Sequence, residues 1–285
     1  MWPAVGTSLT RWGRRAWHRS VRHLASRRLL GIPDAVARLA RSYLRSYDPS
    51  PDPYDLRTNG EQLVIERVLR PGSIAFDVGA NVGDWSALAL AAGATVHAFE
   101  ISPETAGALS SRFTGEPQVT VHGVGLSDAP GELEIRHYPD APVLSTTITD
   151  YPHPHRFEDL TVPVTAGAEF ADAHDIDRID LLKIDVEGAE PAVLTGFGPM
   201  LERGQIDVIQ FEYGLVAVIE KFLVRDFYAL LEPLGFTLGP LGPDGVDFTP
   251  YRIELELFEH VNWVAVRADR ADLVDRLRRG IGQSA

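Results

Sequence analysis

The sequence predicts an α/β fold, with a mostly parallel sheet and helices on both of its faces. Strand-like apolar runs alternate with helical segments from about residue 59 to residue 267, and strands separated by helices usually lie parallel in one sheet. Two neighbouring strand-like runs end in acids, Asp77 and Glu100, and a glycine-containing turn follows the first. This pattern is typical of a βαβ unit that holds a nucleoside.

Helix caps and breakers mark the first half of the alternation. Asn59 can cap a helix, and Pro71-Gly72 ends that helix before the next strand. Ser102-Pro103-Glu104 combines a cap, a first-turn proline and an acid, which predicts another helix start. We therefore expect helices at 59–69, directly after the glycine turn and at 102–113, and strands at 73–78, 94–100 and 118–125.

The second half continues the alternation after an interruption at 131–166, where the β-like runs are short. The third strand should end near Ser127-Asp128 before this interruption. The last two strands are joined by a loop without a helix, so they should pair antiparallel. We expect helices at 189–201 and 220–232, and strands at 179–185, 206–212, 236–241 and 260–267.

The turn after the first acid indicates which nucleoside could bind. It lacks the Lys-Ser/Thr pair of a phosphate-binding P-loop, and Asn81 stands between Gly79 and Gly83 where a dinucleotide fingerprint has glycine. Asparagine tolerates left-handed backbone, so Asn81 can take that place. The carboxylate of Asp77 would repel a pyrophosphate but suits a cationic ligand such as S-adenosylmethionine.

The second acid has the spacing of a ribose ligand. Glu100 follows Gly79 by 21 residues, as expected for the acid that binds ribose hydroxyls. A buried strand turn with incidental acids is the alternative, but the coincidence of two strand-end acids with a glycine turn favours the nucleoside site.

A second motif carries charged residues at the carboxyl end of the predicted strand at 179–185. Lys183, Asp185 and Glu187 alternate along DLLKIDVEGAE, so they should share one side of the strand. Ligands of open α/β sheets lie at this edge. One base between two carboxylates can serve as a general base or hydroxyl clamp, or as a structural salt-bridge cluster.

These motifs resemble the FkbM family of S-adenosylmethionine-dependent methyltransferases. The strings that carry the resemblance are FDVGANVG, FE, GVGLSDAPGELEI, LLKIDVEGAEPAVLTG and VIQFEYG, spread over about 60–266. The resemblance implies the class I methyltransferase (Rossmann-like) fold, with a seven-stranded, mostly parallel sheet and an antiparallel last strand. It also implies methyl transfer to a hydroxyl of a sugar, glycan or secondary metabolite.

The resemblance also assigns residues to the donor S-adenosylmethionine. Asp77, Gly79, Asn81 and Gly83 would border its methionine part, and Glu100 would bind its ribose. Asp128, expected at the end of the third strand, would accept a hydrogen bond from the adenine amino group.

Methyl transfer to an alcohol needs the acceptor oxygen held near the methyl carbon and a base for its proton. The candidate groups for this step are Lys183, Asp185, Glu187, Glu212, His153, His155 and His260. The three histidines could equally be ordinary polar residues of a loop or a strand start. A divalent cation such as Mg²⁺ bridging Asp185 and Glu212 is a further option, since paired carboxylates suit it. Tyr213 could add an apolar face for a sugar ring.

Charge divides the chain into two predicted parts. Residues 1–47 hold ten arginines against Asp34, for a net charge of +9, which leaves −22 for the rest of a chain whose total is −13. We interpret 1–47 as a basic, tryptophan-bearing helical extension that packs on the domain or a second subunit, or contacts an anionic membrane surface. Residues 48–285 form the methyltransferase domain.

Composition limits the other possibilities. The chain has no cysteine, which excludes disulfides and thiolate metal sites. It has no apolar run long enough to span a membrane and no secretory signal, so we expect a cytoplasmic enzyme. The acidic body argues against a nucleic-acid partner. A nucleic-acid methyltransferase, an NAD-dependent oxidoreductase and a binding module without activity remain as alternatives.

Residues 137–160 differ from the rest of the chain in their prolines, tyrosines and histidines. Long irregular insertions are commonly functional. We expect this segment to form a rim over the acceptor site, with a surface loop as the alternative.

Overall fold

The computed structural model describes residues 55–139, 146, 156–258 and 261–279. The predicted extension 1–47 and its boundary at residue 48 therefore lie outside the described residues. The helices are α3 (Glu61–Val68), α4 (Asp84–Ala91), α5 (Pro103–Arg112), α6 (Gly167–Ala173), α7 (Glu190–Gly196), α8 (Gly198–Glu202), α9 (Val216–Glu220), α10 (Val224–Leu231) and α11 (Ala271–Leu277), with 3₁₀ turns η3 (Glu232–Leu234) and η4 (Ile253–Leu255). The strands are β1 (Ile74–Val78), β2 (Thr95–Phe99), β3 (Val119–His122), β4 (Gly125–Ser127), β5 (Gly131–His137), β6 (Glu158–Ala166), β7 (Ile179–Ile184), β8 (Ile206–Tyr213), β9 (Phe236–Gly242), β10 (Gly245–Val246) and β11 (Val261–Arg267).

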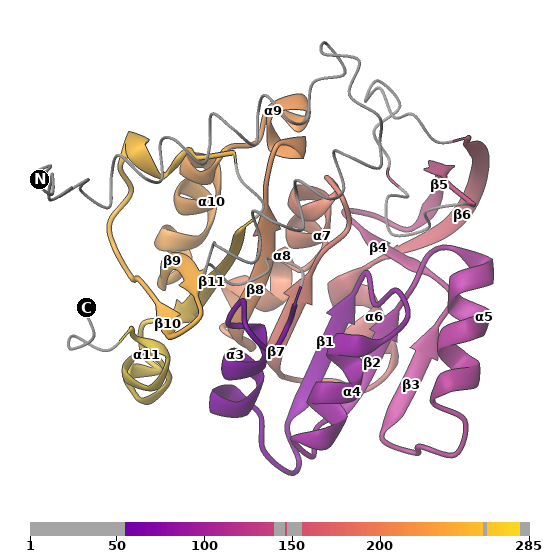
Figure 1. The fold of residues 1–285 in the computed structure, drawn as a ribbon, viewed down its shortest axis with the longest axis horizontal. Helices are drawn as coiled ribbons and strands as arrows, with labels where there is room; N and C mark the ends of the chain where they lie inside the picture. The colour runs from indigo at the N-terminus through magenta and orange to yellow at the C-terminus, as the bar shows by residue number, and fades with distance from the viewer. Residues whose placement is uncertain (1–54, 140–145, 147–155, 259–260, 280–285) are drawn as a thin grey trace, which may run out of the picture. The chain divides into compact units, whose positions relative to one another are not determined.

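The main sheet has the predicted mostly parallel architecture (Figure 1). Its strand order is β10-β9-β11-β8-β7-β1-β2-β3, and the five strands from β8 to β3 are parallel neighbours. Strand β11 runs antiparallel to β8 and β9 on its two sides, which confirms the antiparallel pairing expected for the last two strands. The two-residue β10 adds a short eighth strand to the expected seven.

Helices cover both faces of this sheet because its strands are apolar on both sides. In β7, Leu181 packs with α3, α4 and α11 on one face, whereas Leu182 packs with α6, α7, α8 and α10 on the other. Both side chains are fully buried. Alternating side chains that are all apolar are the mark of a strand covered on both faces. The described residues include no helix of the length and apolarity that crossing a membrane would require.

The predicted third strand is wrong in its second half. Strand β3 ends at His122, and Gly125–Ser127 instead forms β4 in a separate three-stranded sheet of order β4-β6-β5. Strand β6 provides a parallel ladder for β4, and Gly125 fits there because an added Cβ would lie 2.5 Å from Ile101 Cδ1. The short β-like runs at 131–166 thus form β5 and β6, and β6 pairs with Gly125–Ser127, the residues expected at the end of the third strand.

Two predicted helices are interrupted. The helix expected at 189–201 is divided into α7 and α8 at the fully buried Phe197. The chain passes close to β4 there, since an added Cβ on Gly196 would lie 2.0 Å from the carbonyl oxygen of Ser127. The helix expected at 220–232 begins only at Val224, after Lys221 in left-handed conformation ends α9.

A histidine cluster lies on the α6 face of the sheet, on strands β2 and β3. His97 Nδ1 and His122 Nε2 are 3.1 Å apart, and the His122 ring stacks on Phe99 and meets Phe170 and His174 edge to face. Burial lowers the pKa of His122 to about 4, and the neighbouring His97 and His174 add to this effect. The folded protein therefore holds this ring neutral.

We predict that this cluster weakens the fold in mild acid. A histidine pKa below its ordinary value means that the unfolded chain takes up the proton more readily, so the contribution of His122 is complete above about pH 6.5 and declines as the pH falls towards 4. His122→Phe keeps the ring stacking and should reduce the drop in melting temperature between pH 7.5 and pH 5. An equal drop in both proteins, measured by circular dichroism, would contradict this role.

Candidate active site

The turn between β1 and α4 has the left-handed backbone that the sequence predicted. Gly79, Asn81 and Gly83 have φ values of 80°, 49° and 87°. An added Cβ on Gly79 would lie 1.8 Å from the carbonyl oxygen of Asp185, so only glycine fits there. The turn is thus packed directly against the chain leaving β7, which is where the second motif begins.

Glu100 supports this turn from the end of β2. Its Oε2 accepts a hydrogen bond from the backbone N–H of Asn81 at 2.9 Å, and its Oε1 accepts one from the N–H of Ser102 at 2.8 Å. The side chain is 8 % exposed, and burial raises its pKa. Each carboxylate oxygen can accept a second hydrogen bond, so Glu100 can shape the turn and bind hydroxyls as well.

Asp77 is fully buried and forms an ion pair with Lys183. Its Oδ1 lies 3.1 Å from Lys183 Nζ, and its Oδ2 accepts a 2.6 Å hydrogen bond from Ser86. The register of β1 and β7 places the two residues directly opposite each other. Asp77 is not among the described residues that line the cavity below, so it acts on the site through Lys183.

Lys183 connects the glycine turn to the second motif. Its Nζ donates to the carbonyl oxygen of Gly79 at 3.0 Å and lies 3.5 Å from Asp185 Oδ2. Burial alone would lower its pKa, but the carboxylates of Asp77, Asp185 and Glu61 outweigh burial and raise it. These carboxylates therefore favour the charged ammonium of Lys183, which holds the glycine turn next to Asp185.

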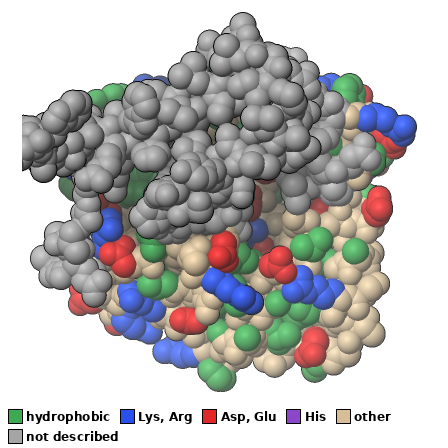
Figure 2. All heavy atoms as spheres, viewed as in Figure 1, with side chains coloured by type: hydrophobic (Ala, Val, Ile, Leu, Met, Phe, Trp, Pro, Cys, Tyr) green, Lys and Arg blue, Asp and Glu red, His purple; other side chains and the backbone are tan. Residues whose placement is uncertain are grey.

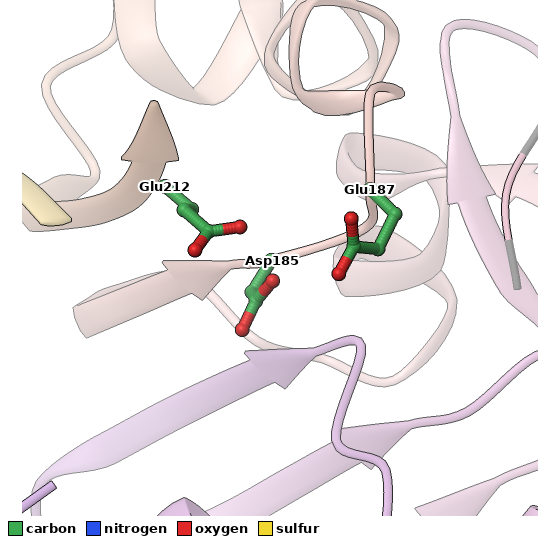
Figure 3. A group of neighbouring side chains, drawn as sticks. All are labelled: Asp185, Glu187 and Glu212. Atoms are coloured by element: carbon green, nitrogen blue, oxygen red, sulfur yellow. The ribbon is translucent and has the colours of Figure 1, made fainter. Parts of the chain in front are cut away.

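Three carboxylates gather beyond the ends of β7 and β8 (Figure 3). Asp185 and Glu212 extend from the two strand ends, and Glu187 reaches towards them from the following turn. One oxygen of each lies within 4.8 Å of the others, a spacing that could hold a metal ion. Burial raises the pKa of Asp185, Lys183 opposes this rise, and Glu212 adds to it. The structure thus brings together three of the predicted catalytic residues.

The turn that carries Glu187 is fastened by Glu190, to which the sequence patterns assigned no role, and by Thr146, which belongs to the segment 137–160 that we expected at the rim of the acceptor site. Glu190 is 7 % exposed and accepts hydrogen bonds from the N–H groups of Val186 and Gly188, both at 3.0 Å. Burial raises its pKa to about 7. Thr146 donates to the carbonyl oxygen of Glu187 at 2.7 Å. In the sequence, the only local signal for Glu190 was its position as an acid near the start of the helix predicted at 189–201.

One cavity of about 560 Å³ joins the glycine turn to the carboxylates, which is within the usual range for small-molecule sites. Its described lining residues are Leu56, Glu61, Val78, Gly79, Ala80, Asn81, Val82, Gly83, Asp84, Trp85, Phe99, Glu100, Ile101, Gly125, Leu126, Leu133, Ile135, Thr146, Lys183, Asp185, Val186, Glu187, Ala189, Glu212 and Asn262. The sequence patterns gave no signal for Glu61 and Asn262, which come from α3 and β11, or for the apolar Leu133 and Ile135 of β5.

Other predicted site residues lie elsewhere. Asp128 is exposed after β4, accepts a hydrogen bond from Ser127, and is not among the described lining residues. Tyr213 is 3 % exposed, donates its hydroxyl to Glu256, and does not line this cavity. His260, like His153 and His155, lies outside the described residues, as does most of 137–160. Thr146 is the described residue by which that segment reaches the cavity.

We predict that Lys183→Met destabilises the fold by about 3–5 kcal/mol, because it leaves the charge of Asp77 buried without a partner. The midpoint of urea unfolding measures this loss. The double variant Asp77→Asn with Lys183→Met should recover much of it, since both buried charges are then gone. If the double variant is no more stable than Lys183→Met, the loss comes from packing and not from the charge.

Comparisons with known proteins identify the family of this chain. A family model described as "Methyltransferase FkbM domain" matches residues 77–238. The hexuronic acid methyltransferase AglP of Haloferax volcanii is 27 % identical over 166 residues, which cover 56 % of this chain and 65 % of that protein. The 31-O-demethyl-FK506 methyltransferase FkbM of Streptomyces tacrolimicus is 31 % identical over 161 residues, covering 45 % of this chain and 60 % of that one.

The chain thus spans somewhat less than two thirds of each of these relatives. Two solved structures also align with it. An rRNA methylase from Streptococcus thermophilus has a TM-score of 0.41 at 13 % identity, over 73 % of this chain and 93 % of that one. A TehB-like S-adenosylmethionine-dependent methyltransferase from Corynebacterium glutamicum has a TM-score of 0.39 at 13 % identity, over 82 % and 97 %. The family match covers more than half of the chain and contains both the glycine turn and the carboxylate cluster, and the protein belongs to the FkbM methyltransferase family.

Proposed function

We propose that this protein is an S-adenosylmethionine-dependent O-methyltransferase whose acceptor is a neutral or cationic hydroxyl compound, such as a sugar, a glycan or a secondary metabolite. One observation carries the proposal. The glycine turn and the carboxylate cluster line the same cavity, and Lys183 bonds to both, at Gly79 and at Asp185. A donor held at the turn would therefore present its methyl group near the carboxylates.

The reaction asks for positioning and for one proton acceptor. The acceptor oxygen forms a bond to the methyl carbon, the carbon–sulfur bond breaks, and its electron pair goes to the sulfonium, which becomes a neutral thioether. The hydroxyl proton passes to a carboxylate, for which Asp185 is the best candidate. Its pKa is raised by burial, and a base works best when its pKa approaches the working pH.

The carboxylates also bear on the kind of acceptor. Ionised Asp185, Glu187 and Glu212 accept hydrogen bonds from hydroxyl groups and disfavour anions. The two relatives support sugars and secondary metabolites as the class, since one is a hexuronic acid methyltransferase and the other a 31-O-demethyl-FK506 methyltransferase. A hexuronic acid is itself an anion, so the relatives support the hydroxyl acceptor and not its charge. Within that class, the carboxylates favour an uncharged or cationic group at the reacting centre.

The alternatives fit less well. The family assignment is to methyltransferases and offers nothing for an NAD-dependent oxidoreductase. A nucleic-acid substrate would meet carboxylates at the cavity, and Figure 2 shows acidic and basic side chains interspersed over the described part of the visible face, without a continuous basic surface there.

A divalent cation held by the three carboxylates is a second arrangement of the same site. It could bind the acceptor oxygen in place of a direct carboxylate contact. Activity that is abolished by a chelator and restored by Mg²⁺ would favour the cation, and activity that persists in the chelator would favour direct proton transfer to Asp185.

We predict that Glu100→Ala weakens S-adenosylmethionine binding by about 1–3 kcal/mol, the scale of hydrogen-bonding groups left without partners. The variant loses the proposed ribose contact and also the two backbone contacts that shape the turn. Calorimetric titration measures the effect. Glu104→Ala, which removes an exposed acid from the first turn of α5, four residues after Glu100, is the matched control. Unchanged affinity in Glu100→Ala would contradict the ribose role.

We predict that Asp185→Asn lowers turnover by about 10²–10⁴-fold, the usual contribution of general acid–base catalysis, with donor affinity little changed. S-adenosylhomocysteine release can be followed with a panel of glycosides and polyketide alcohols. Because the base must be ionised, wild-type turnover should fall as the pH drops through the raised pKa of Asp185. Asp177→Asn removes an exposed acid and serves as the control. Full turnover in Asp185→Asn would show that Asp185 is not the base, and catalysis would then rest on positioning the acceptor oxygen next to the methyl group.

A further inference from the structure

Glu61 is a buried carboxylate at the cavity that the methyltransferase family match does not include, since that match begins at residue 77. It starts α3, is 5 % exposed and lines the cavity. The backbone before it is held in place: Gly60 has a φ of 106°, and an added Cβ would lie 2.3 Å from the carbonyl oxygen of Gly242. Glu61 is therefore fixed at the wall of the cavity.

Among the described residues, only neutral groups donate hydrogen bonds to the carboxylate of Glu61. Asn59 Nδ2 donates to it at 2.7 Å, Gln210 Nε2 at 2.6 Å and Asn262 Nδ2 at 3.1 Å. Lys183 attracts it from a distance, but the hydrogen bond and ion pairs of that ammonium are with Gly79, Asp77 and Asp185. The charge of Glu61 is thus solvated by amides and has no cation of its own among the described residues.

Packing alone does not call for a charge here. Gln210 Oε1 is buried and has no hydrogen-bond partner among the described residues. If residue 61 were glutamine, the Gln210 amide could turn over and accept a hydrogen bond from it through that oxygen, and Gln210 Nε2 would then give up its 3.4 Å contact with Asn262 Oδ1. A buried charge costs free energy that a neutral amide does not. A positively charged ligand in the cavity would explain why residue 61 is a carboxylate and not an amide.

The described residues that line the cavity also carry far more negative than positive charge. It contains six acids, Glu61, Asp84, Glu100, Asp185, Glu187 and Glu212, and one base, Lys183. S-adenosylmethionine carries a sulfonium, whereas the product S-adenosylhomocysteine carries a neutral thioether at the same place. The two molecules otherwise share their charged groups, so a negative charge near the sulfur favours the donor over the product.

We propose that Glu61 is a specificity-determining residue that makes the cavity prefer the sulfonium donor to the thioether product. It acts through its charge, with no need for contact with the reacting atoms. A product that is held less tightly leaves sooner, so Glu61 would limit product inhibition. This inference rests on the proposed placement of the donor in the cavity.

The test is the ratio of the dissociation constants of S-adenosylhomocysteine and S-adenosylmethionine, measured by calorimetry on the full chain. Glu61→Gln keeps the shape and removes the charge, and the ratio should fall by about 3- to 20-fold, the range of a partly screened charge–charge attraction. Glu61→Asp should retain the wild-type ratio even if both affinities drop. Glu66→Gln removes an exposed acid from the same helix and should leave the ratio unchanged.

An unchanged ratio in Glu61→Gln, or an equal weakening of both ligands, would overturn the proposal and leave Glu61 as a structural support for Asn262. If Glu61→Gln does not fold, Glu61→Ala can be measured in its place. Its ratio should also fall, and an unchanged ratio in Glu61→Ala would overturn the proposal. Wild-type protein that binds neither ligand would instead contradict the placement of the donor.

Discussion

The buried ion pair between Asp77 and Lys183 is the contact on which the site depends. It joins β1 to β7 at their carboxyl ends, where each strand leads into a functional turn. The same ammonium bonds to the carbonyl oxygen of Gly79 and lies near Asp185. Because a buried lysine keeps its charge only when carboxylates surround it, the acids of the site and the anchor that orders them require each other. One ion pair therefore fixes the positions of both the glycine turn and the carboxylate cluster.

Excess negative charge is the second constraint on this cavity. Acids outnumber bases among its described lining residues, and burial raises the pKa of Glu61, Glu100 and Asp185. Such a cavity is costly without a ligand, because like charges repel and each is partly removed from water. A sulfonium donor would offset that cost. On the proposed placement of the donor, methyl transfer would remove the positive charge and so weaken the hold on the product.

Sequence patterns predicted the sheet well where structure is local. The alternation of strands and helices, the glycine turn with its left-handed Asn81 and the antiparallel last strand all follow from short segments. The predicted elements are wrong where a segment distant in sequence determines the local structure. The chain after His122 leaves the main sheet because β6, about forty residues later, provides a ladder for Gly125–Ser127. The helix after Ala189 is interrupted at Phe197, beside that same small sheet.

By itself, the sequence determined the βαβ unit, the family-like motifs and the carboxylates at the strand ends, since each is a property of a few consecutive residues. The tertiary structure decided how those residues are used. It buried Asp77 against Lys183, left Asp128 exposed outside the cavity, and brought Glu61 and Asn262 to the site from opposite ends of the domain. Strand register and side-chain pairing over two hundred residues produce these contacts, and no local pattern encodes them because each partner is unremarkable in its own segment.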